Sequence, residues 1–557
     1  MSGVSRRPPI AGLAAIGAVA VALFAIRLTG LPNLMENEYR LGAYVLDVLQ
    51  HGNWLCPRDS IGNTDKPPML AWLAALASLP VGRVTRLTLY LPSALATLGI
   101  AWLVAAAGSA RFSIRAGCLG GLAYLLSDVG AHQIATARWD GLFALTVTIA
   151  ALLAFQAWET GGGWTWFWLA AAAATLTKGP LGVLLAALGL AALLWERRSG
   201  HATRLAGSHV VGVALFLLVT VGWFVLAYQR VGPHLVTNMI GDEFIGNMTE
   251  HRVAYRFWKP LGDFLANFAP WSVATCVALY RVIAHPARRD DVRRFERFLL
   301  CWFAGGLLLF CVSPHNQARL MYPLIPAAAL LAGRELDRLS AGISGRALTA
   351  VAGVAVATAL AIFVFQYHRL EAREPGVRET LALERLAADV RSTLGDDLPL
   401  TYVEGTPFAF QLLLNTMRPT VSYETAADLL RRDEAVVVAV DDPARLRRAL
   451  GTASAVHEIA RAADDRTAYL HLVGNRARVA HDDSRAVGMG GLIVTLHGVR
   501  LGPTSDDALV VYKGIRAGSA VVQNDSSGAQ KIAVAIGNSP STSAVLEPGG
   551  AWRIDVP

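Results

Sequence analysis

The sequence predicts a polytopic α-helical membrane protein with a soluble C-terminal region. Of its 557 residues, 54% are hydrophobic and 17% are charged, and the mean hydropathy is +0.41. Apolar runs near the length of a bilayer-spanning helix, about 20 residues, recur between residues 10 and 366. The composition then changes to short strand-like and helix-like segments, which is typical of soluble domains.

The first apolar run follows Arg6 and Arg7, a pattern shared by signal peptides and first transmembrane helices. No small-residue cleavage site follows it and many further runs do, so we expect it to be retained. About eleven runs are candidate spans, within an expected total of about 11–13: residues 10–29, 86–108, 116–134, 141–158, 163–177, 179–195, 205–228, 261–284, 296–312, 319–336 and 347–366.

Two further segments are predicted to form helices at the membrane surface, within the polar loop 30–85. Residues 67–81 are apolar but too short to span comfortably. Residues 40–50 carry apolar side chains near helical spacing.

The arginines indicate the orientation of the chain. They gather on alternate connections, near residues 6–7, 111–115, 197–204, 281–294 and 334–346, which the positive-inside rule assigns to the cytoplasm. The N-terminus is then cytoplasmic, and residues 30–85, the long loop 229–260 and the C-terminal region lie in the periplasm of a bacterial inner membrane. Because this explains the net charge of +8, we do not expect nucleic-acid binding.

We expect three domains: a transmembrane domain, residues 1–366; an α/β domain, residues 367–480; and a β-rich domain, residues 481–557. In the second, the strand-like runs LPLTYVEG, EAVVVAVDD and TAYLHLVGN alternate with helix-like segments. In the third, short strands between Gly, Ser and Asn turns favour a β-sandwich.

Ionisable residues gather at span ends on the predicted periplasmic side. They come from residues 30–85, from two span ends and from the loop 229–260: Glu36, Glu38, Arg40, Arg58, Asp65, Lys66, Arg138, Asp140, Lys178, Glu243 and Arg256. A solvated loop is the simple explanation for any one of them. Together they favour a cavity in which Lys and Arg bind a lipid phosphate while a carboxylate deprotonates an incoming hydroxyl.

Cysteine and histidine patterns indicate no metal site. The five cysteines form no CxxC pair, and His51, His132, His251 and His315 are scattered along the chain. We expect neither a metal nor another cofactor apart from the substrate lipid.

The motifs resemble a known family. HGNW at 51–54, DKPP at 65–68, LTKGP at 176–180, VGWFVLAYQ before the long loop and LMYPLIPAAALLA around Tyr322 occur in this order. They are similar to the protein mannosyltransferase and aminoarabinose transferase group of GT-C glycosyltransferases. The resemblance extends to about residue 335.

The resemblance implies an inverting transfer of a sugar from a polyprenyl phosphate, such as undecaprenyl phosphate, to lipid A, a glycan or a protein. Lys66 matches the phosphate-contacting lysine, with Arg58, Lys178, Arg256, Arg40 and Tyr322 as further donor contacts. Asn37 occupies the usual position of the catalytic Asp and cannot act as a base. Glu38 is therefore the expected base or acceptor-orienting acid, followed by Asp140 and Glu36. Glu243, Arg138 and Asn37 are placed near the acceptor or in its loop.

Three other functions remain open at this point: a secondary transporter, a catalytically inactive lipid-binding homologue, and an assembly protein whose tail does the work. Transporters usually carry their charges near the bilayer midplane and often show repeated halves. This sequence has neither feature. We expect a monomer that contacts membrane lipid, the donor and an envelope acceptor.

Overall fold

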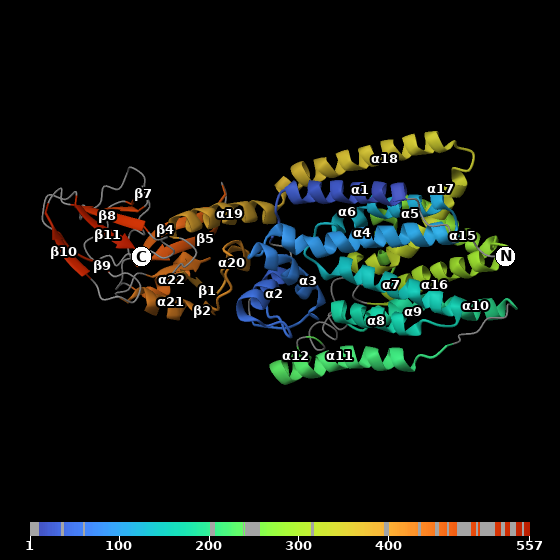
Figure 1. Ribbon diagram of the computed structural model, residues 1–557, viewed down its shortest axis with the longest axis horizontal. Helices are drawn as coiled ribbons and strands as arrows, with labels where there is room; N and C mark the ends of the chain where they lie inside the picture. The colour runs from blue at the N-terminus through green and yellow to red at the C-terminus, as the bar shows by residue number, and fades with distance from the viewer. Residues whose placement is uncertain are drawn as a thin grey trace. The chain divides into compact units, whose positions relative to one another are not determined.

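The computed structural model describes residues 10–34, 38–59, 62–200, 207–237, 239, 257–313, 317–394, 400–432, 436–451, 456–464, 467–475, 492–496, 499–501, 518–524, 530–534, 542–547 and 551–556. The chain divides into two compact units, Met1–Val377 and Arg378–Pro557 (Figure 1). The first unit is helical, and the second combines helices with strands.

The first unit is a helix bundle. Its elements are α1 (Ile10–Thr29), α2 (Glu38–His51), α3 (Met69–Ser78), η1 (Leu79–Val81), α4 (Arg86–Arg111), α5 (Ile114–Leu125), α6 (Asp128–Gln133), α7 (Trp139–Thr160), α8 (Trp164–Lys178), α9 (Leu181–Ala187), η2 (Leu188–Ala191), α10 (Ala192–Arg198), α11 (Val210–Val231), α12 (His234–Val236), α14 (Lys259–Asn267), α15 (Trp271–Ala284), α16 (Asp290–Val312), η4 (Ala318–Leu324), α17 (Ile325–Leu339), α18 (Gly345–Phe365), η5 (Gln366–Leu370) and η6 (Glu371–Arg373).

Six of the described helices are long and apolar enough to cross a membrane: α1, α4, α7, α11, α16 and the helix from Gly345 to Arg373. Several other apolar runs are divided into shorter helices. Pro270 separates α14 from α15, and Pro323 lies in η4 before α17. Because proline has no backbone N–H, it interrupts a helix within a run that composition presents as continuous.

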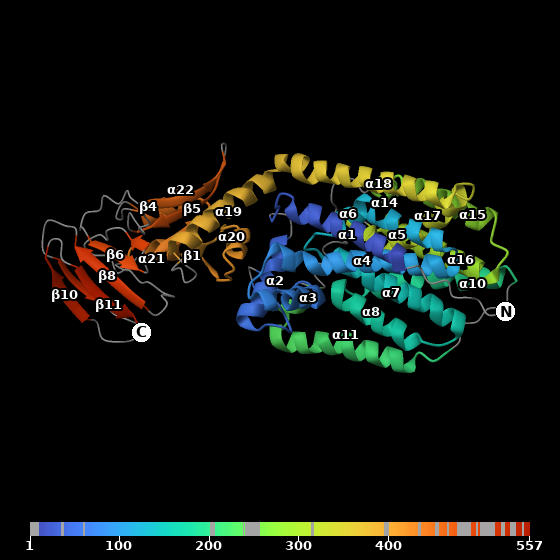
Figure 2. The same ribbon diagram turned by 45° about the horizontal axis from the view of Figure 1, so that its top comes forward.

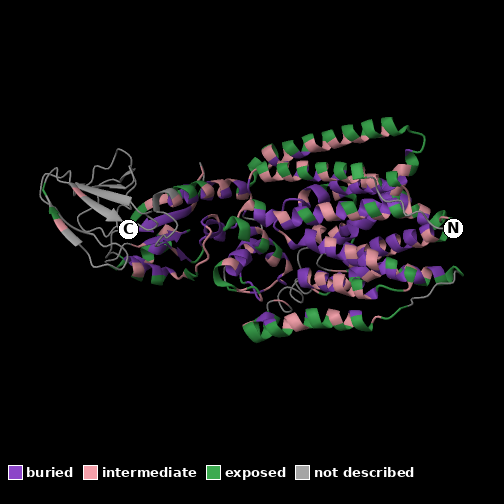
Figure 3. Cartoon of the chain, viewed as in Figure 1, coloured by how far each residue is buried: buried purple, intermediate pink, exposed green. Residues whose placement is uncertain are grey.

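Burial distinguishes central from peripheral helices (Figure 3). α7 is mostly buried, whereas α11 and α18 are exposed along most of their length. α18 packs beside α1 (Figures 1 and 2), and α11 packs against α8. Helices that are apolar on their exposed faces as well are typical of membrane spans.

The loop 30–85 contains the two predicted short helices, α2 and α3. α2 is buried along most of its length, so it belongs to the protein interior and not to an exposed surface. It packs against α3, whose N-cap is Pro68. This burial places the two acids of α2, Glu38 and Asp47, inside the protein.

Glycines bring α5 and α17 into close contact. A Cβ atom on Gly333 would lie 2.4 Å from the carbonyl oxygen of Ala116 and 2.6 Å from the Cα of Gly120. A Cβ on Gly120 would in turn lie 2.9 Å from the carbonyl oxygen of Ala329. Such backbone approach requires glycine and is common between membrane helices.

The second unit begins within α19 (Pro375–Leu394). Its further elements are β1 (Leu400–Val403), α20 (Phe408–Leu413), β2 (Thr420–Val421), α21 (Tyr423–Leu430), β3 (Val437–Val440), α22 (Pro443–Leu450), β4 (His457–Ala463), β5 (Ala468–Gly474), β6 (Leu492–Leu496), β7 (Val499–Leu501), β8 (Gly518–Asn524), β9 (Gln530–Val534), β10 (Thr542–Leu546) and β11 (Ala551–Val556).

Among the described strands, the first five form one sheet in the order β2-β1-β3-β5-β4. β1 is parallel to β2 and β3, while β5 is antiparallel to β3 and β4. β1, β3 and β5 coincide with the strand-like runs of the sequence. The remaining strands form a four-stranded sheet, β11-β8-β6-β7, and a two-stranded sheet, β10-β9.

We expect Gly333→Ala to lower the thermal stability of the protein, because the added Cβ meets the backbone of α5. Overpacking typically costs about 1–3 kcal/mol, so the unfolding midpoint in mild detergent should fall by about 2–4 °C or more. Gly353→Ala on α18 is the matched control, since a Cβ there meets no atom within 4 Å. Equal midpoints for the two variants would contradict the close packing of α5 and α17.

Candidate functional site

The loop after α2 is organised around the buried carboxylate of Asp47. Its oxygens accept hydrogen bonds from Asn53 Nδ2 at 3.0 and 3.1 Å and from the backbone N–H of Arg58 at 2.8 Å. His51 Nδ1 lies 2.8 Å from Oδ1. A carboxylate that is 2% exposed requires such partners. The HGNW turn therefore takes its shape from a residue of α2.

The DKPP segment is tied to α2 through Asp65. Arg40 Nη2 lies 2.7 Å from Asp65 Oδ2, and the hydroxyl of Tyr44 donates to Asp65. Burial and the Asp65 charge hold the pKa of Tyr44 well above its usual value, so the phenol remains a neutral donor. Lys66 follows directly and is half buried. Two predicted phosphate contacts, Arg40 and Lys66, are thus held next to Asp65.

Glu38 is the first residue of α2 and is 6% exposed. The hydroxyl of Tyr90 on α4 donates to its carboxylate. Burial raises the pKa of Glu38 to about 7, against the opposing effects of this hydrogen bond and of the positive charges of Arg27, Arg86 and Arg138. A carboxyl group with such a pKa is available in both protonation states near neutral pH, which suits a general base.

Asp140 lies in the first turn of α7, is 4% exposed and is ion-paired with Lys178 at the end of α8. Gly179, with φ of 96°, ends α8, and Pro180 is the N-cap of α9. The Lys-Gly-Pro sequence therefore stops the helix with the lysine at its C-terminus, where a cation is favoured.

Further charges surround Asp140. Arg138, the N-cap residue of α7, interacts electrostatically with both Asp140 and Glu38. The positive charge of Arg319 in η4 interacts with Asp140, and the charge of Asp140 in turn acts on the hydroxyl of Tyr322, also in η4. We call the group of Glu38, Arg138, Asp140, Lys178, Arg319 and Tyr322 the carboxyl cluster. The predicted site residues within it are Glu38, Arg138, Asp140, Lys178 and Tyr322.

The other predicted residues have different outcomes. Arg58 is exposed, and its backbone is held by Asp47. Glu36, Asn37, Glu243 and Arg256 lie outside the described residues. Within the described part of the chain, no group of three or more His, Cys, Asp or Glu side chains is arranged to hold a metal ion.

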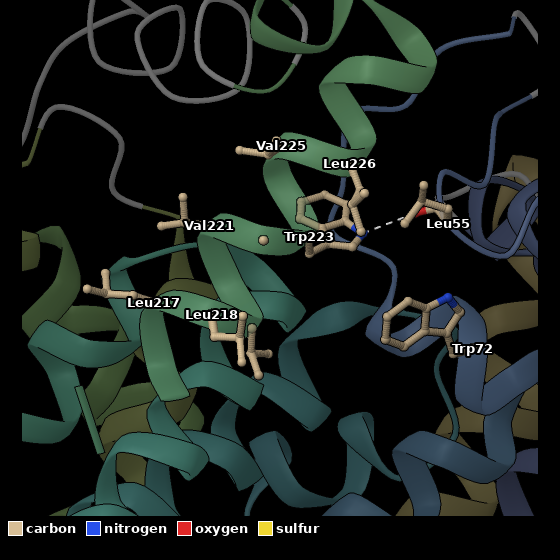
Figure 4. A pocket seen from close by; sticks show the side chains of 10 residues that line it. Leu55, Trp72, Leu217, Leu218, Val221, Trp223, Val225 and Leu226 are labelled. Carbon is tan, nitrogen blue, oxygen red and sulfur yellow. Dashed lines mark hydrogen bonds between the residues drawn. The ribbon is translucent and has the colours of Figure 1, made fainter. Parts of the chain in front are cut away.

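An open apolar pocket of about 860 Å³ lies along α11 (Figure 4). Trp223 donates its indole N–H to the backbone oxygen of Leu55 at 3.1 Å, which joins α11 to the loop 30–85. All lining residues are apolar: Leu55, Trp72, Leu217, Leu218, Val219, Val221, Gly222, Trp223, Val225 and Leu226. We call this pocket the α11 groove. Its volume lies within the usual range for small-molecule sites, about 300–1,000 Å³.

Several residues of the site were not predicted from the sequence: Arg27, Asp47, Arg86, Tyr90 and Arg319. Each lies inside or at the end of a helix, where a polar residue is readily explained as a membrane-interface anchor or as a hydrogen-bonding partner within the helix. Arg319 alone carried a detectable signal, because it is an arginine three residues before Tyr322 at the edge of a predicted span.

Comparison with known proteins finds sequence similarity to sugar transferases. The family model for dolichyl-phosphate-mannose-protein mannosyltransferases matches residues 65–225, a stretch that contains Lys66, Asp140 and Lys178. The undecaprenyl phosphate-alpha-4-amino-4-deoxy-L-arabinose arabinosyl transferase 1 of Pseudomonas fluorescens is 26% identical over 328 residues, which is 56% of this chain and 56% of that protein. The corresponding transferase 2 of Proteus mirabilis is 25% identical over 346 residues, 58% of this chain and 60% of that protein. The matches thus span less than two thirds of these relatives.

Solved structures extend the likeness to the fold. ArnT from Cupriavidus metallidurans bound to undecaprenyl phosphate aligns with a TM-score of 0.65 at 18% identity, covering 85% of this chain and 99% of that one. Its apo state gives a TM-score of 0.62 at 16% identity, covering 84% and 99%. The predicted resemblance to the aminoarabinose transferase group of GT-C glycosyltransferases is confirmed, as is the multi-pass helical fold with a β-sheet-containing C-terminal region.

We expect Asp47→Ala to loosen the loop after α2, because the Arg58 N–H and the Asn53 amide lose their acceptor. Leaving buried donors unpaired costs about 1–3 kcal/mol, so limited trypsin cleavage after Arg58 should become faster and the unfolding midpoint should fall. Asp428→Ala is the control, since that carboxylate is 68% exposed and pairs with Arg431 on the surface of α21. Unchanged cleavage after Arg58 in Asp47→Ala would contradict the organising role of Asp47.

Proposed function

We propose that this chain is an inverting glycosyltransferase that moves a sugar from a polyprenyl-phosphate donor to an acceptor of the cell envelope. The observation that carries the proposal is the carboxyl cluster, in which two buried carboxyl groups lie among cations at one end of the bundle. The sequence relationship to arabinosyl transferases that act with undecaprenyl phosphate supports the same chemistry.

In the proposed reaction, Glu38 is the general base. Its carboxylate takes the proton of an acceptor hydroxyl, whose oxygen attacks the anomeric carbon from the side opposite the phosphate. The bond between that carbon and the phosphate oxygen breaks, and its electron pair stays on the departing polyprenyl phosphate. A pKa of about 7 leaves the Glu38 carboxylate substantially ionised at neutral pH yet able to accept a proton.

The two carboxyl groups of the cluster have different tasks in this proposal. Asp140 is already paired with Lys178, so it holds that cation in place and is less suited to accept a proton. Glu38 has a neutral phenol as its hydrogen-bond donor and keeps its proton affinity. Such divergent environments commonly separate the roles of neighbouring acids.

The donor phosphate is proposed to bind at Lys66 and Arg40, with Lys178 and Arg138 available to the reacting end. Cations at this point stabilise the charge that grows on the leaving phosphate. The α11 groove is proposed to take the polyprenyl chain, because Leu55 lies in the same loop as Lys66 and Trp72 lies in α3, which begins three residues after Lys66. Apolar surface along the remaining groove matches a hydrocarbon chain.

The site and the second unit are proposed to face the periplasm of a bacterial inner membrane, with the N-terminus in the cytoplasm, as the arginine distribution favours. We propose that the enzyme acts as a monomer and uses no cofactor beyond the lipid-linked donor. Lipid A, a glycan and a protein remain the candidate acceptors.

The test is donor binding and transfer by purified protein in mild detergent, beginning with undecaprenyl phosphate and its aminoarabinose conjugate. We expect Lys66→Ala to lose lipid binding in native mass spectrometry. Glu38→Gln should retain binding and lose transfer by roughly 100-fold or more, the usual contribution of a general base. Lys531→Ala and Glu424→Gln in the second unit serve as controls.

Absence of both lipid binding and transfer in the wild type would contradict the proposed function. Lipid binding without transfer to any of the three acceptor classes would support an inactive lipid-binding homologue. Equal lipid binding by the wild type and Lys66→Ala would remove Lys66 from the phosphate site.

The α11 groove gives a separate prediction. Gly222→Phe should fill the groove without backbone clash, because a Cβ at Gly222 meets no atom within 4 Å. We expect its KM for a long-chain donor to rise about 10-fold, equivalent to about 1.4 kcal/mol of lost binding, while a short-chain donor is affected less. Gly353→Phe on α18 introduces the same side chain at an equally open position outside the groove. The same rise with both donors, or in both variants, would argue against the groove as the chain site.

A further inference from the structure

Arg27, in the last turn of α1, is held by the segment that follows α18. Its Nη1 lies 3.0 and 3.1 Å from the two carboxylate oxygens of Glu371, and its guanidinium carbon lies 4.0 Å from the ring centre of Tyr367. Nη2 also reaches the backbone oxygen of Ala135 at 3.5 Å. The side chain of Arg27 is 11% exposed. The cation is therefore largely removed from water and fixed from several sides.

The same end of α1 is joined to the donor of the Glu38 hydrogen bond. Arg86 Nη2 donates to the backbone oxygen of Gly30 at 3.2 Å, and the Arg86 guanidinium carbon lies 5.7 Å from the ring centre of Tyr90. Tyr90 in turn donates to Glu38. A continuous set of contacts thus leads from Glu371 to the carboxyl cluster.

The groups that act on Glu38 come from three helices. They are Tyr90 and Arg86 of α4, Arg27 of α1 and Arg138 at the start of α7. Arg27 also acts on His132 and Tyr367. Charges in a poorly solvated region interact strongly, and a carboxylate paired with a cation reduces the field of that cation at a third group. Glu371 is placed to reduce the effect of Arg27 on Glu38.

We propose that Glu371 is a positioning residue for the transfer reaction, holding Arg27 in place and partly neutralising it so that the Glu38 carboxyl retains its affinity for a proton. The inference rests on the proposed role of Glu38 as the base. Glu371 itself touches no reacting atom. It lies 344 positions from Arg27 in the sequence, in the stretch that connects the first unit to the second.

The experiment titrates Glu38 directly, independently of catalysis. The infrared carbonyl band of its protonated carboxyl is identified as the band that Glu38→Gln removes, and its intensity is followed against pH in the full-length protein. In Glu371→Gln, the charge of Arg27 is no longer offset, while Tyr367 and the Ala135 oxygen still hold it. The pKa of Glu38 should then fall by about half a pH unit or more.

Activity should follow with the same sign. A base must be ionised, so kcat/KM of the wild type should rise with pH through about 7. A lower pKa moves this rise to lower pH in Glu371→Gln. Glu371→Asp should restore the wild-type midpoint in large part, and Asp291→Asn, which breaks the exposed Arg289–Asp291 ion pair, should leave it unchanged.

Removing the cation gives the opposite sign. Arg27→Gln should raise the midpoint of the Glu38 band, and adding Glu371→Gln to it should lower the midpoint part of the way back, because the charge of Glu371 then no longer acts on Glu38. An unchanged or raised midpoint in folded Glu371→Gln would overturn the inference. A shifted band without any transfer activity would instead leave the inference standing and count against the proposed function.

Discussion

A carboxyl group removed from water must gain either a proton or a partner, and this constraint shapes the interior of the first unit. Asp47 is satisfied by the loop that folds around it, and Asp140 by Lys178. Among the described residues, Glu38 receives a hydrogen bond from the neutral phenol of Tyr90 and has no cation at ion-pair distance. Its surrounding arginines act from farther away, so burial dominates and the proton affinity stays high. The segment 30–85 is polar because its acids serve as hydrogen-bonding and ion-pair partners inside the folded protein.

Other buried acids of the bundle are paired directly with arginines. Glu196 of α10 is bound by two arginines of α16, with Arg293 at 3.1 Å and Arg297 at 2.8 Å. Glu159 of α7 likewise pairs with Arg111 and Arg294. Each of these acids has two direct cationic partners, and the ion pairs fix the positions of the helices. Glu159 and Glu196 are glutamates like Glu38, but they differ from Glu38 in the number of cations at ion-pair distance.

Sequence patterns predicted the parts of the site that are local. The apolar run 67–81 predicted α3, the end of another apolar run placed Lys178 at a helix end, and apolar spacing predicted α2. The burial of α2 was not predictable, because it depends on helices that come later in the chain. Tyr90 is 52 positions from Glu38, and no pattern in either segment indicates their contact. Prolines interrupt two of the predicted runs, at Pro270 and Pro323, and this contributes to the smaller number of long helices among the described residues.

Under the proposed function, the same long-range pairing would suit Glu38 to act as the base, although Asn37 stands where the resembled family has its catalytic Asp. A base needs a suitable position and a suitable proton affinity, and burial at the first turn of α2 raises the proton affinity of Glu38. Arg27 and Arg86 oppose that effect, so their charges must be held at a distance or offset. Glu371 provides such an offset for Arg27, and Gly30 binds the guanidinium of Arg86 through its backbone oxygen. The proton affinity of Glu38 is therefore set by residues outside the motifs that resemble the family.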